Sequence, residues 1–387
     1  LYCAALEYGT LLPGSLIADT PVNINGFAPQ NYDLTYDGAV PASEAVSRSL
    51  NVPSVHILRK YGIESFLSTL RECGMTTFTR SAEDYGLSLI LGGGECRLDE
   101  IVSAYASMSR AYSQGESDFP LSDRVALWHT FNAMSEVNRP DEIDWHVIRS
   151  AGRTAWKTGT SYGYRDGWAC GVTPAVAAGV WAGNASGAAA PGLIGARTAG
   201  PVLFDILNLF PEKSWFSEPA DNEGILTPVC HQSGCIAGPY CEERDTLLIP
   251  RAGLRTETCP YHYRIDGKNI FRLPPAMEWY YRQKHPEYGR KDRTETMPSG
   301  ISPMEFIYPE GGSIITLPRQ LDGSPGEMVF NLAHHDNDAT VYWHLDNEYI
   351  GETRFIHQYR MRPSPGPHSV TVVDNTGNTI SVGFTIR

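Results

Sequence analysis

Hydrophobic residues recur with helical spacing through the first third of the chain. Residues 1–8 have the composition of a helix that stops at Gly9. Residues 63–74 and 96–112 carry apolar side chains three and four positions apart, a spacing that places them on one face of a helix. These segments predict a largely helical beginning.

A proline interrupts the helical pattern that starts at Pro41. The residue before a proline is pushed out of the α region, so we expect a break around Asn51 and Val52 and a second helix from Pro53. Ser49 and Asn51, two positions apart, can line one cavity only where a helix ends. A serine and an asparagine that merely close a helix are the more ordinary explanation of this pair.

Strand-like sequence replaces the helical pattern from residue 153. The runs 153–160 and 168–183 are rich in β-branched and aromatic residues and predict antiparallel strands around a turn. Helices followed by such strands indicate an α+β domain, which we place at 1–212. Short alternating runs over 300–387 predict a small β-sandwich, and 213–299 is expected to be a cysteine-rich, irregular connector.

The first predicted strand contains a candidate anion-binding sequence, Lys157-Thr158-Gly159-Thr160. On a strand, Lys157 and Gly159 share one face, and Thr158 and Thr160 share the other. Glycine lets another backbone approach closely, while the lysine charge and a threonine hydroxyl can bind a terminal carboxylate. A tripeptide of this kind is weak evidence alone, and an exposed edge strand is the alternative.

Composition and charge exclude several classes of protein. The 387 residues are 42% hydrophobic and 11% aromatic, as in a folded globular protein. A net charge of -13 argues against nucleic-acid binding, which depends on clustered lysine and arginine. The longest apolar run, 175–182, is far below the roughly 20 residues that span a bilayer.

The chain begins without a methionine and within a helix-like segment, so we expect it to be cut from a longer protein.

Ser49-Leu50-Asn51 followed by Lys-Thr-Gly matches, in order, two of the three motifs of penicillin-interacting serine enzymes. The stretches "PASEAVSRSLNVPSVHILRKYG", "LGGGECRLDEIVSAYASMS" and "WKTGTSYGYRDGWACGV" resemble the transpeptidase domain of bifunctional, class A penicillin-binding proteins, C subtype. The tail from about Ile301 resembles the sandwich that closes that subtype. The resemblance implies a β-lactamase-like α+β domain followed by an immunoglobulin-like β-sandwich.

The remaining one of the three motifs, Ser-x-x-Lys, is missing from the sequence. None of the six lysines has a serine three residues before it. The resemblance implies that this pair lies within about two helical turns upstream of Leu1. We therefore expect the chain as printed to lack its nucleophile and to be inactive.

The resemblance also implies a mechanism and a role for each matching residue. The missing serine attacks the bond between two D-alanines of a peptidoglycan stem peptide and forms an acyl-enzyme, without any cofactor. Ser49 relays a proton, Asn51 orients the substrate amide, and Lys157 keeps the site electropositive. Residues 158–160 bind the substrate, with the threonine hydroxyls on its carboxylate and the Thr160 amide as an oxyanion donor.

The cellular setting follows from the same resemblance. It implies an N-terminal membrane anchor, a glycosyltransferase domain, and work at the periplasmic face of the bacterial cytoplasmic membrane. The expected partners are stem peptides, β-lactam antibiotics and, through the sandwich, cell-wall assembly proteins. Two alternatives remain: hydrolysis, as in a D,D-carboxypeptidase or a β-lactamase, or a non-catalytic scaffold that binds cell-wall peptides or proteins.

Four of the eight cysteines fall within 30 residues: Cys230, Cys235, Cys241 and Cys259. The other four are scattered, as small buried residues often are. Outside the cytoplasm, a close group of four most simply forms two disulfides, which is our prediction. A metal site of Cys230, Cys241, Cys259 and His262 is an alternative, because His262 follows Cys259 by three, and unmodified thiols are another. We expect His334, His335 and Asp336 to be a solvated loop.

Overall fold

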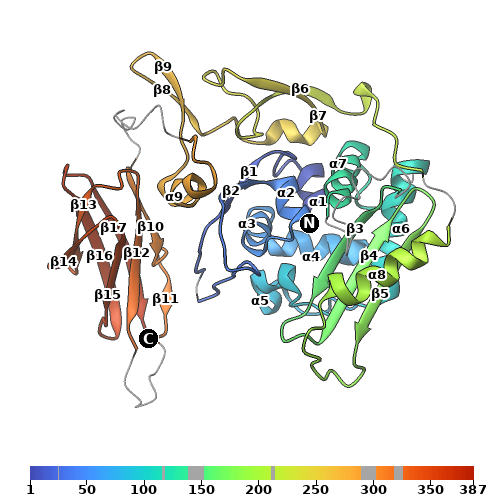
Figure 1. Cartoon of the computed structure of the whole chain (residues 1–387), viewed down its shortest axis with the longest axis horizontal. Helices are drawn as coiled ribbons and strands as arrows, with labels where there is room; N and C mark the ends of the chain where they lie inside the picture. Colours follow the sequence, from blue (N-terminus) through green and yellow to red (C-terminus); the bar gives the residue numbers. More distant parts are fainter. Residues whose placement is uncertain (25, 116–117, 138–151, 211–213, 289–301, 318–325) are drawn as a thin grey trace. The chain divides into compact units, whose positions relative to one another are not determined.

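The computed structural model describes residues 1–24, 26–115, 118–137, 152–210, 214–288, 302–317 and 326–387. Its contacts divide the chain into two compact units (Figure 1). The first unit contains Leu1–Ile17, Pro41–Gly238 and Glu243–Cys259. The second contains Ala18–Val40, Pro239–Glu242 and Pro260–Arg387.

The first unit is built from α-helices, short 3-10 helices, a three-stranded antiparallel sheet and, within its described residues, the antiparallel pair of strands β6 (Ile225–Cys230) and β7 (Arg244–Ile249). Its α-helices are α1 (Tyr2–Glu7), α2 (Ala42–Ser47), α3 (Asn51–Tyr61), α4 (Ile63–Glu72), α5 (Ala82–Tyr85), α6 (Leu98–Gln114), α7 (Arg124–Ser135) and α8 (Gly195–Asn208). The 3-10 helices are η1 (Gly86–Leu91), η2 (Asp221–Glu223) and η3 (Arg251–Arg255). Within the described residues the sheet has the order β3 (Ala155–Thr160), β4 (Asp166–Val172) and β5 (Ala177–Gly183).

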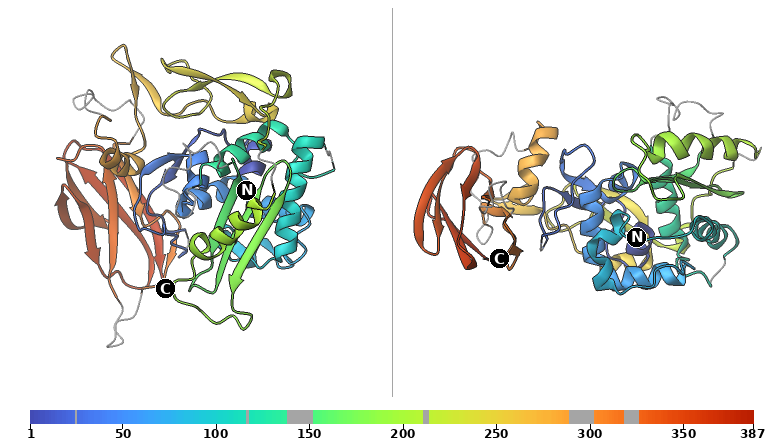
Figure 2. Two further views of the ribbon diagram at one scale, coloured as in Figure 1. Left: turned by 45° about the vertical axis from the view of Figure 1, so that its right-hand side comes forward. Right: turned by 90° about the horizontal axis from the view of Figure 1, so that it is seen from below.

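Helices lie against this sheet and fix its first strand. Helix α8 lies along all three strands (Figures 1 and 2), α6 contacts β4 and β5, and α7 contacts β3. The fully buried Trp156 packs among α8 side chains and donates its indole N–H to the Val137 carbonyl at 3.1 Å. Its neighbour Ala155 is buried in the cluster formed by α1, α6 and α7. Because side chains alternate along a strand, Lys157 shares the face of Ala155.

Helix α1 is buried in the middle of this unit. Ala4, Ala5 and Leu6 have no exposed surface. They pack in one cluster with Phe131 of α7, whose ring stacks on Phe216 with centroids 4.1 Å apart. A helix of six residues is too short to be stable alone, so α1 is held by this packing.

The helical break differs from the expectation. The chain leaves α2 after Ser47 and re-enters a helix already at Asn51, whereas the break was predicted at Asn51 and Val52. Pro53 lies in the first turn of α3, where its missing N–H has no helical partner to lose. The non-helical residues are therefore 48–50, and Ser49 has a left-handed backbone with φ of 57°.

The second unit contains a β-sandwich, as predicted. One sheet has the order β10 (Met304–Tyr308), β12 (Met328–His334) and β15 (His357–Met361). The other has the order β11 (Ile314–Ile315), β17 (Thr379–Ile386), β16 (Gly366–Asp374), β13 (Thr340–Leu345) and β14 (Glu348–Arg354). Both sheets contribute to one core, in which the Phe330 ring stacks on Trp343.

Three parts of the expected connector are regular. Strands β6 (Ile225–Cys230) and β7 (Arg244–Ile249) pair, as do β8 (His262–Ile265) and β9 (Lys268–Phe271). Residues 275–284, expected to be irregular, form helix α9 (Pro275–Lys284), which packs on β10 and β12. Proline at the first position of a helix is favourable, so "LPPAMEWYY" starts a helix instead of preventing one.

An early segment of the chain belongs to this second unit. Strands β1 (Leu16–Asp19) and β2 (Gly38–Pro41) pair, and Tyr36 lies edge-on to Tyr280 of α9 with ring centroids 5.7 Å apart. Gly38 has φ of 78° and approaches α9 so closely that a Cβ would lie 2.2 Å from the Met277 carbonyl oxygen. Only glycine fits this position.

His334 and His335 do not form a solvated loop, so that expectation was wrong. His334 ends β12 and is buried, with Nε2 3.3 Å from the Asp374 carboxylate. His335 Nδ1 lies 2.6 Å from a Glu278 carboxylate oxygen of α9. Arg272 donates to His335 Nε2 at 2.6 Å, and because a guanidinium only donates, the ring proton belongs on Nδ1. The two histidines thus tie α9 and β16 to the end of β12.

Candidate functional site

The structure brings Ser49 and Lys157 into direct contact. The Lys157 ammonium donates a hydrogen bond to Ser49 Oγ, although the two residues are 108 positions apart. It also donates to the Thr158 carbonyl oxygen at 3.0 Å. The turn between α2 and α3 therefore faces the first strand of the sheet.

The backbone at Ser49 is unusual. A residue other than glycine with φ of 57° is in the left-handed region, which costs roughly 1–2 kcal/mol. Ser49 is exposed, and its N–H donates to the Val46 carbonyl at 3.1 Å in a tight turn after α2. Asn51, the first residue of α3, is half-buried and follows directly on this turn. The turn thus presents the Ser49 hydroxyl to the strand.

Lys157 is half-buried beneath this turn. Burial lowers its pKa to about 8 from the ordinary 10.5, because a desolvated ammonium is less stable than a hydrated one. Among the described residues no carboxylate forms an ion pair with it. The ammonium is still mostly charged at neutral pH and can bind an anion.

Residues 158–160 occupy an edge of the sheet, since β3 pairs only with β4 among the described strands. A Cβ on Gly159 would meet nothing closer than the Trp168 Cβ, at 3.7 Å, so space is open on the Lys157 face. Thr160 is on the opposite face, where its Oγ1 accepts a hydrogen bond from the Gly195 N–H at 3.0 Å. One anion can contact both Lys157 and a threonine hydroxyl only at the open edge of the strand, where the two faces meet.

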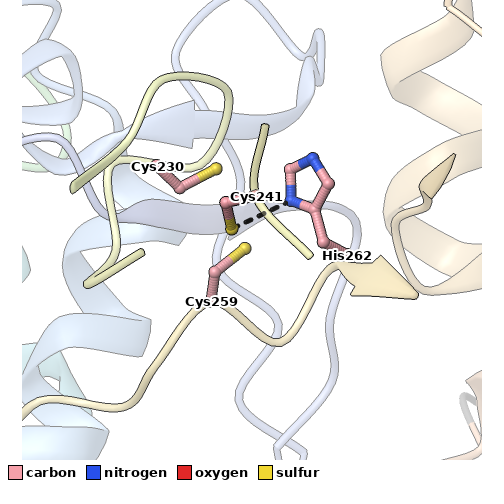
Figure 3. A group of neighbouring side chains, drawn as sticks. All are labelled: Cys230, Cys241, Cys259 and His262. Atoms are coloured by element: carbon pink, nitrogen blue, oxygen red, sulfur yellow. Dashed lines mark hydrogen bonds between the residues drawn. The ribbon is translucent and has the colours of Figure 1, made fainter. Parts of the chain in front are cut away.

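The cysteine group is arranged differently from the expectation. None of the eight cysteines, all of which the structure describes, forms a disulfide. Instead the sulfur atoms of Cys230, Cys241 and Cys259 and a ring nitrogen of His262 lie within 4.8 Å of one another (Figure 3). Cys235, required for two disulfides, is outside this group, and its Sγ donates to the Ser233 carbonyl at 3.6 Å. Three converging thiols and an imidazole fit one metal ion better than two disulfides.

Similarity to known proteins covers the whole chain. The chain is 34% identical to penicillin-binding protein 1C of Escherichia coli, and the match covers 100% of this chain and 55% of that protein. Residues 294–384 match the Penicillin-Binding Protein C-terminus Family. Over its whole length the chain is similar to a class A penicillin-binding protein of the C subtype. It spans about half the length of its Escherichia coli relative.

Other penicillin-binding proteins match shorter parts of the chain. Penicillin-binding protein 1F of Bacillus subtilis is 27% identical over 47% of this chain and 29% of its own length. The crystal structure of penicillin-binding protein 1A from Haemophilus influenzae has a TM-score of 0.50 and 17% identity, covering 67% of this chain and 47% of that one. This likeness shows the fold, and the predicted α+β fold with a sheet-rich C-terminal part is confirmed.

One charged hollow of this chain was missed by sequence reasoning. A cavity of about 520 Å³ is lined by Glu7, Ser122, Asp123, Arg251, Ala252 and Arg255. Burial raises the pKa of Glu7 to about 7, although its carboxylate accepts a hydrogen bond from the Ser122 N–H at 3.3 Å. No local pattern indicates this hollow, because its basic residues lie more than 240 positions after Glu7.

No helix in the described residues has the length and hydrophobicity to cross a bilayer.

Proposed function

We propose that this protein acts in peptidoglycan synthesis as a serine D,D-transpeptidase that β-lactams acylate. The observation that carries this proposal is the hydrogen bond from Lys157 to Ser49, which joins the Ser-x-Asn and Lys-Thr-Gly segments in one site. Two motifs that meet in space are stronger evidence than two motifs in a sequence.

Each residue has a distinct task in this proposal. Lys157 attracts the substrate carboxylate, which the hydroxyls of Thr158 and Thr160 bind at the edge of β3. The hydroxyl of Ser49, already bonded to Lys157, passes a proton to the departing amine. The Thr160 amide is one oxyanion donor. Asn51, at the start of α3, holds the substrate amide.

The attacking serine is not among these residues. The sequence contains no serine three positions before a lysine, so the nucleophile of the proposed reaction has to come from outside the 387 residues. We infer that 1–212 form the transpeptidase domain, 213–299 the connector and 300–387 the sandwich. The intact protein carries a membrane anchor and a glycosyltransferase domain and works on the periplasmic side, where stem peptides and cell-wall assembly proteins are its partners.

Labelling with fluorescent penicillin tests the proposal. The intact protein, with its own N-terminal part, should form a stable adduct, and the 387 residues alone should not. Lys157→Ala should slow acylation about a hundredfold or more, the usual cost of removing a charge-stabilising group from such a site. Ser47→Ala is the matched control, because Ser47 ends α2 two residues before Ser49 and its hydroxyl donates to the Glu44 carbonyl.

The outcomes separate the candidate functions. An intact, folded protein that stays unlabelled would support a scaffold. Penicillin labelling, together with conversion of a stem peptide into D-alanine and the hydrolysed peptide but not into cross-linked product when an acceptor amine is present, would indicate a D,D-carboxypeptidase. Equal acylation rates for the wild type and Lys157→Ala would refute the assigned role of Lys157.

A further inference from the structure

We propose that Cys230, Cys241, Cys259 and His262 bind one structural zinc ion. Zinc in such sites is tetrahedral, with bonds of about 2.3 Å to sulfur and 2.0–2.1 Å to nitrogen. A tetrahedron of these bonds has edges of roughly 3.8 Å between sulfurs and 3.6 Å between sulfur and nitrogen. Cys241 Sγ and His262 Nδ1 are 3.5 Å apart, already at that separation. With all four ligand atoms within 4.8 Å, shifts of about 1 Å or less complete the site.

The backbone presents the ligands independently of any metal. Cys230 ends β6, and its N–H and C=O bond to Cys235 and Gly234 in a tight turn, each at 2.8 Å. The Cys259 N–H donates to the Ile236 carbonyl at 2.8 Å, which brings the second sulfur beside that turn. His262 begins β8 three residues later. Figure 3 shows the three sulfur atoms and the imidazole ring pointing toward a common centre.

Burial indicates a structural site. Cys230, Cys241 and Cys259 are 1%, 2% and 9% exposed, so protein surrounds the sulfur side of the site. A catalytic zinc keeps a ligand position open to water, whereas a closed set of four protein ligands stabilises the fold. On binding Zn²⁺ the three thiols release three protons, and the site has a net charge of -1.

A buried hydroxyl supports thiolate ligands. Ser233, with no exposed surface, donates its Oγ–H to Cys259 Sγ at 3.1 Å. Hydrogen bonds of this kind to ligand atoms orient them and stabilise their charge. The alternative is oxidation, but a disulfide between any two of the cluster's three cysteines leaves the third beside His262.

The site stabilises a turn that holds the N-terminal segment of the protein. The Leu16 N–H donates to the Ser233 carbonyl at 3.0 Å. Gly234, with φ of 63°, packs so tightly on Gly14 that a Cβ would lie 2.0 Å from the Gly14 oxygen. The Ala42 N–H, at the start of α2, donates to the Ser15 carbonyl at 2.9 Å. Loss of the ion should therefore loosen the turn that supports this segment.

Metal analysis of the whole 387-residue chain, exported to the periplasm and purified without chelators, tests the proposal. We expect about one zinc per chain, in keeping with four ligands and one site. Cys230→Ser should reduce the zinc content at least tenfold and lower the Tm. Cys235→Ser should change neither, which makes it the matched control, because Cys235 lies in the same turn outside the ligand group.

Two further measurements cover a variant that fails to fold. His262→Ala should lose zinc and His262→Cys should retain it, because cysteine also ligates zinc. Cobalt-substituted protein should show the visible bands of a tetrahedral, sulfur-ligated ion, and a chelator should abolish them reversibly. A protein purified without bound metal would overturn the proposal. This holds whether its mass shows the loss of hydrogens that accompanies disulfide formation or shows that the cysteines are reduced. Zinc lost equally from Cys230→Ser and Cys235→Ser would overturn it as well.

Discussion

Replacing Lys157 by methionine tests whether the buried ammonium of Lys157 destabilises the folded protein. Methionine has a similar length and no charge, so it removes the cost of burying the ammonium and keeps most of the packing. The pKa of Lys157 is about 8 in the fold, compared with 10.5 ordinarily, a difference of about 2.5 units. At 1.36 kcal/mol per unit, the buried charge destabilises the folded state by roughly 3 kcal/mol.

The sign of the effect depends on pH. Between about pH 8 and 10.5 only the unfolded chain holds the proton, so wild-type stability rises with pH through this window. The penalty is complete below pH 8 and absent above 10.5. The hydrogen bond to Ser49, worth about 1 kcal/mol, is lost at every pH. Lys157→Met should therefore be about 2 kcal/mol more stable than the wild type at pH 7, and the advantage should disappear by pH 10.5.

Urea unfolding at pH 7 and at pH 10.5, followed by tryptophan fluorescence, measures this difference. Lys60→Met is the control, because Lys60 is an exposed lysine on α3 and its replacement should change stability by less than about 0.5 kcal/mol. If Lys157→Met is less stable than the wild type at pH 7, or keeps the same advantage at pH 10.5, the charge is not desolvated and the reasoning fails.

Three other predictions concern backbone strain and buried titrating groups. Ser49→Gly should be about 1 kcal/mol more stable than Ser49→Ala in urea unfolding, since glycine adopts φ of 57° freely; equal stabilities would contradict the left-handed backbone. Glu7→Gln should raise the Tm at pH 8 but not at pH 4.5, because burial raises the pKa of Glu7 to about 7 and its ionised form is disfavoured in the fold. Burial lowers the pKa of His357 to about 4, so the wild-type sandwich should lose stability as pH falls from 6.5 to 4. His357→Gln should reduce that loss, measured by hydrogen exchange in β12 and β15; an unchanged pH profile would exclude His357 as its source.

Local patterns predicted the elements that have one buried face. Helices α4 and α6 have such faces, and their periodicity placed them correctly. Strands β3 to β5 were predicted from their β-branched and aromatic residues instead. Helix α7 was not predicted, because it is buried on nearly all sides and its sequence "RVALWHTFNAMS" has no polar stripe. Helix α8 contains Pro201 and two glycines, residues that usually mark loops, yet it is held against the sheet.

Side-chain partners from distant parts of the chain could not be predicted from spacing. Two motifs 108 positions apart suggested Ser49 and Lys157 only through family resemblance, and their contact depends on the packing of α2 and α3 beside the sheet. His335 was placed in solvent because its neighbours in sequence are polar, whereas its partners Glu278 and Arg272 come from α9 and the residues before it. The choice between a disulfide and a metal site likewise depends on where Cys235 points.

The contact between Ser49 and Lys157 combines two unfavourable features at one point of the fold. A left-handed serine costs roughly 1–2 kcal/mol, and a desolvated ammonium costs about as much or more. A glycine at 49 and a methionine at 157 would remove both costs, so stability alone does not explain the native pair. What the native pair provides is a hydroxyl bonded to a cation beside the open face of Gly159. Strain and a perturbed charge at the same exposed edge are typical of a site that binds a ligand.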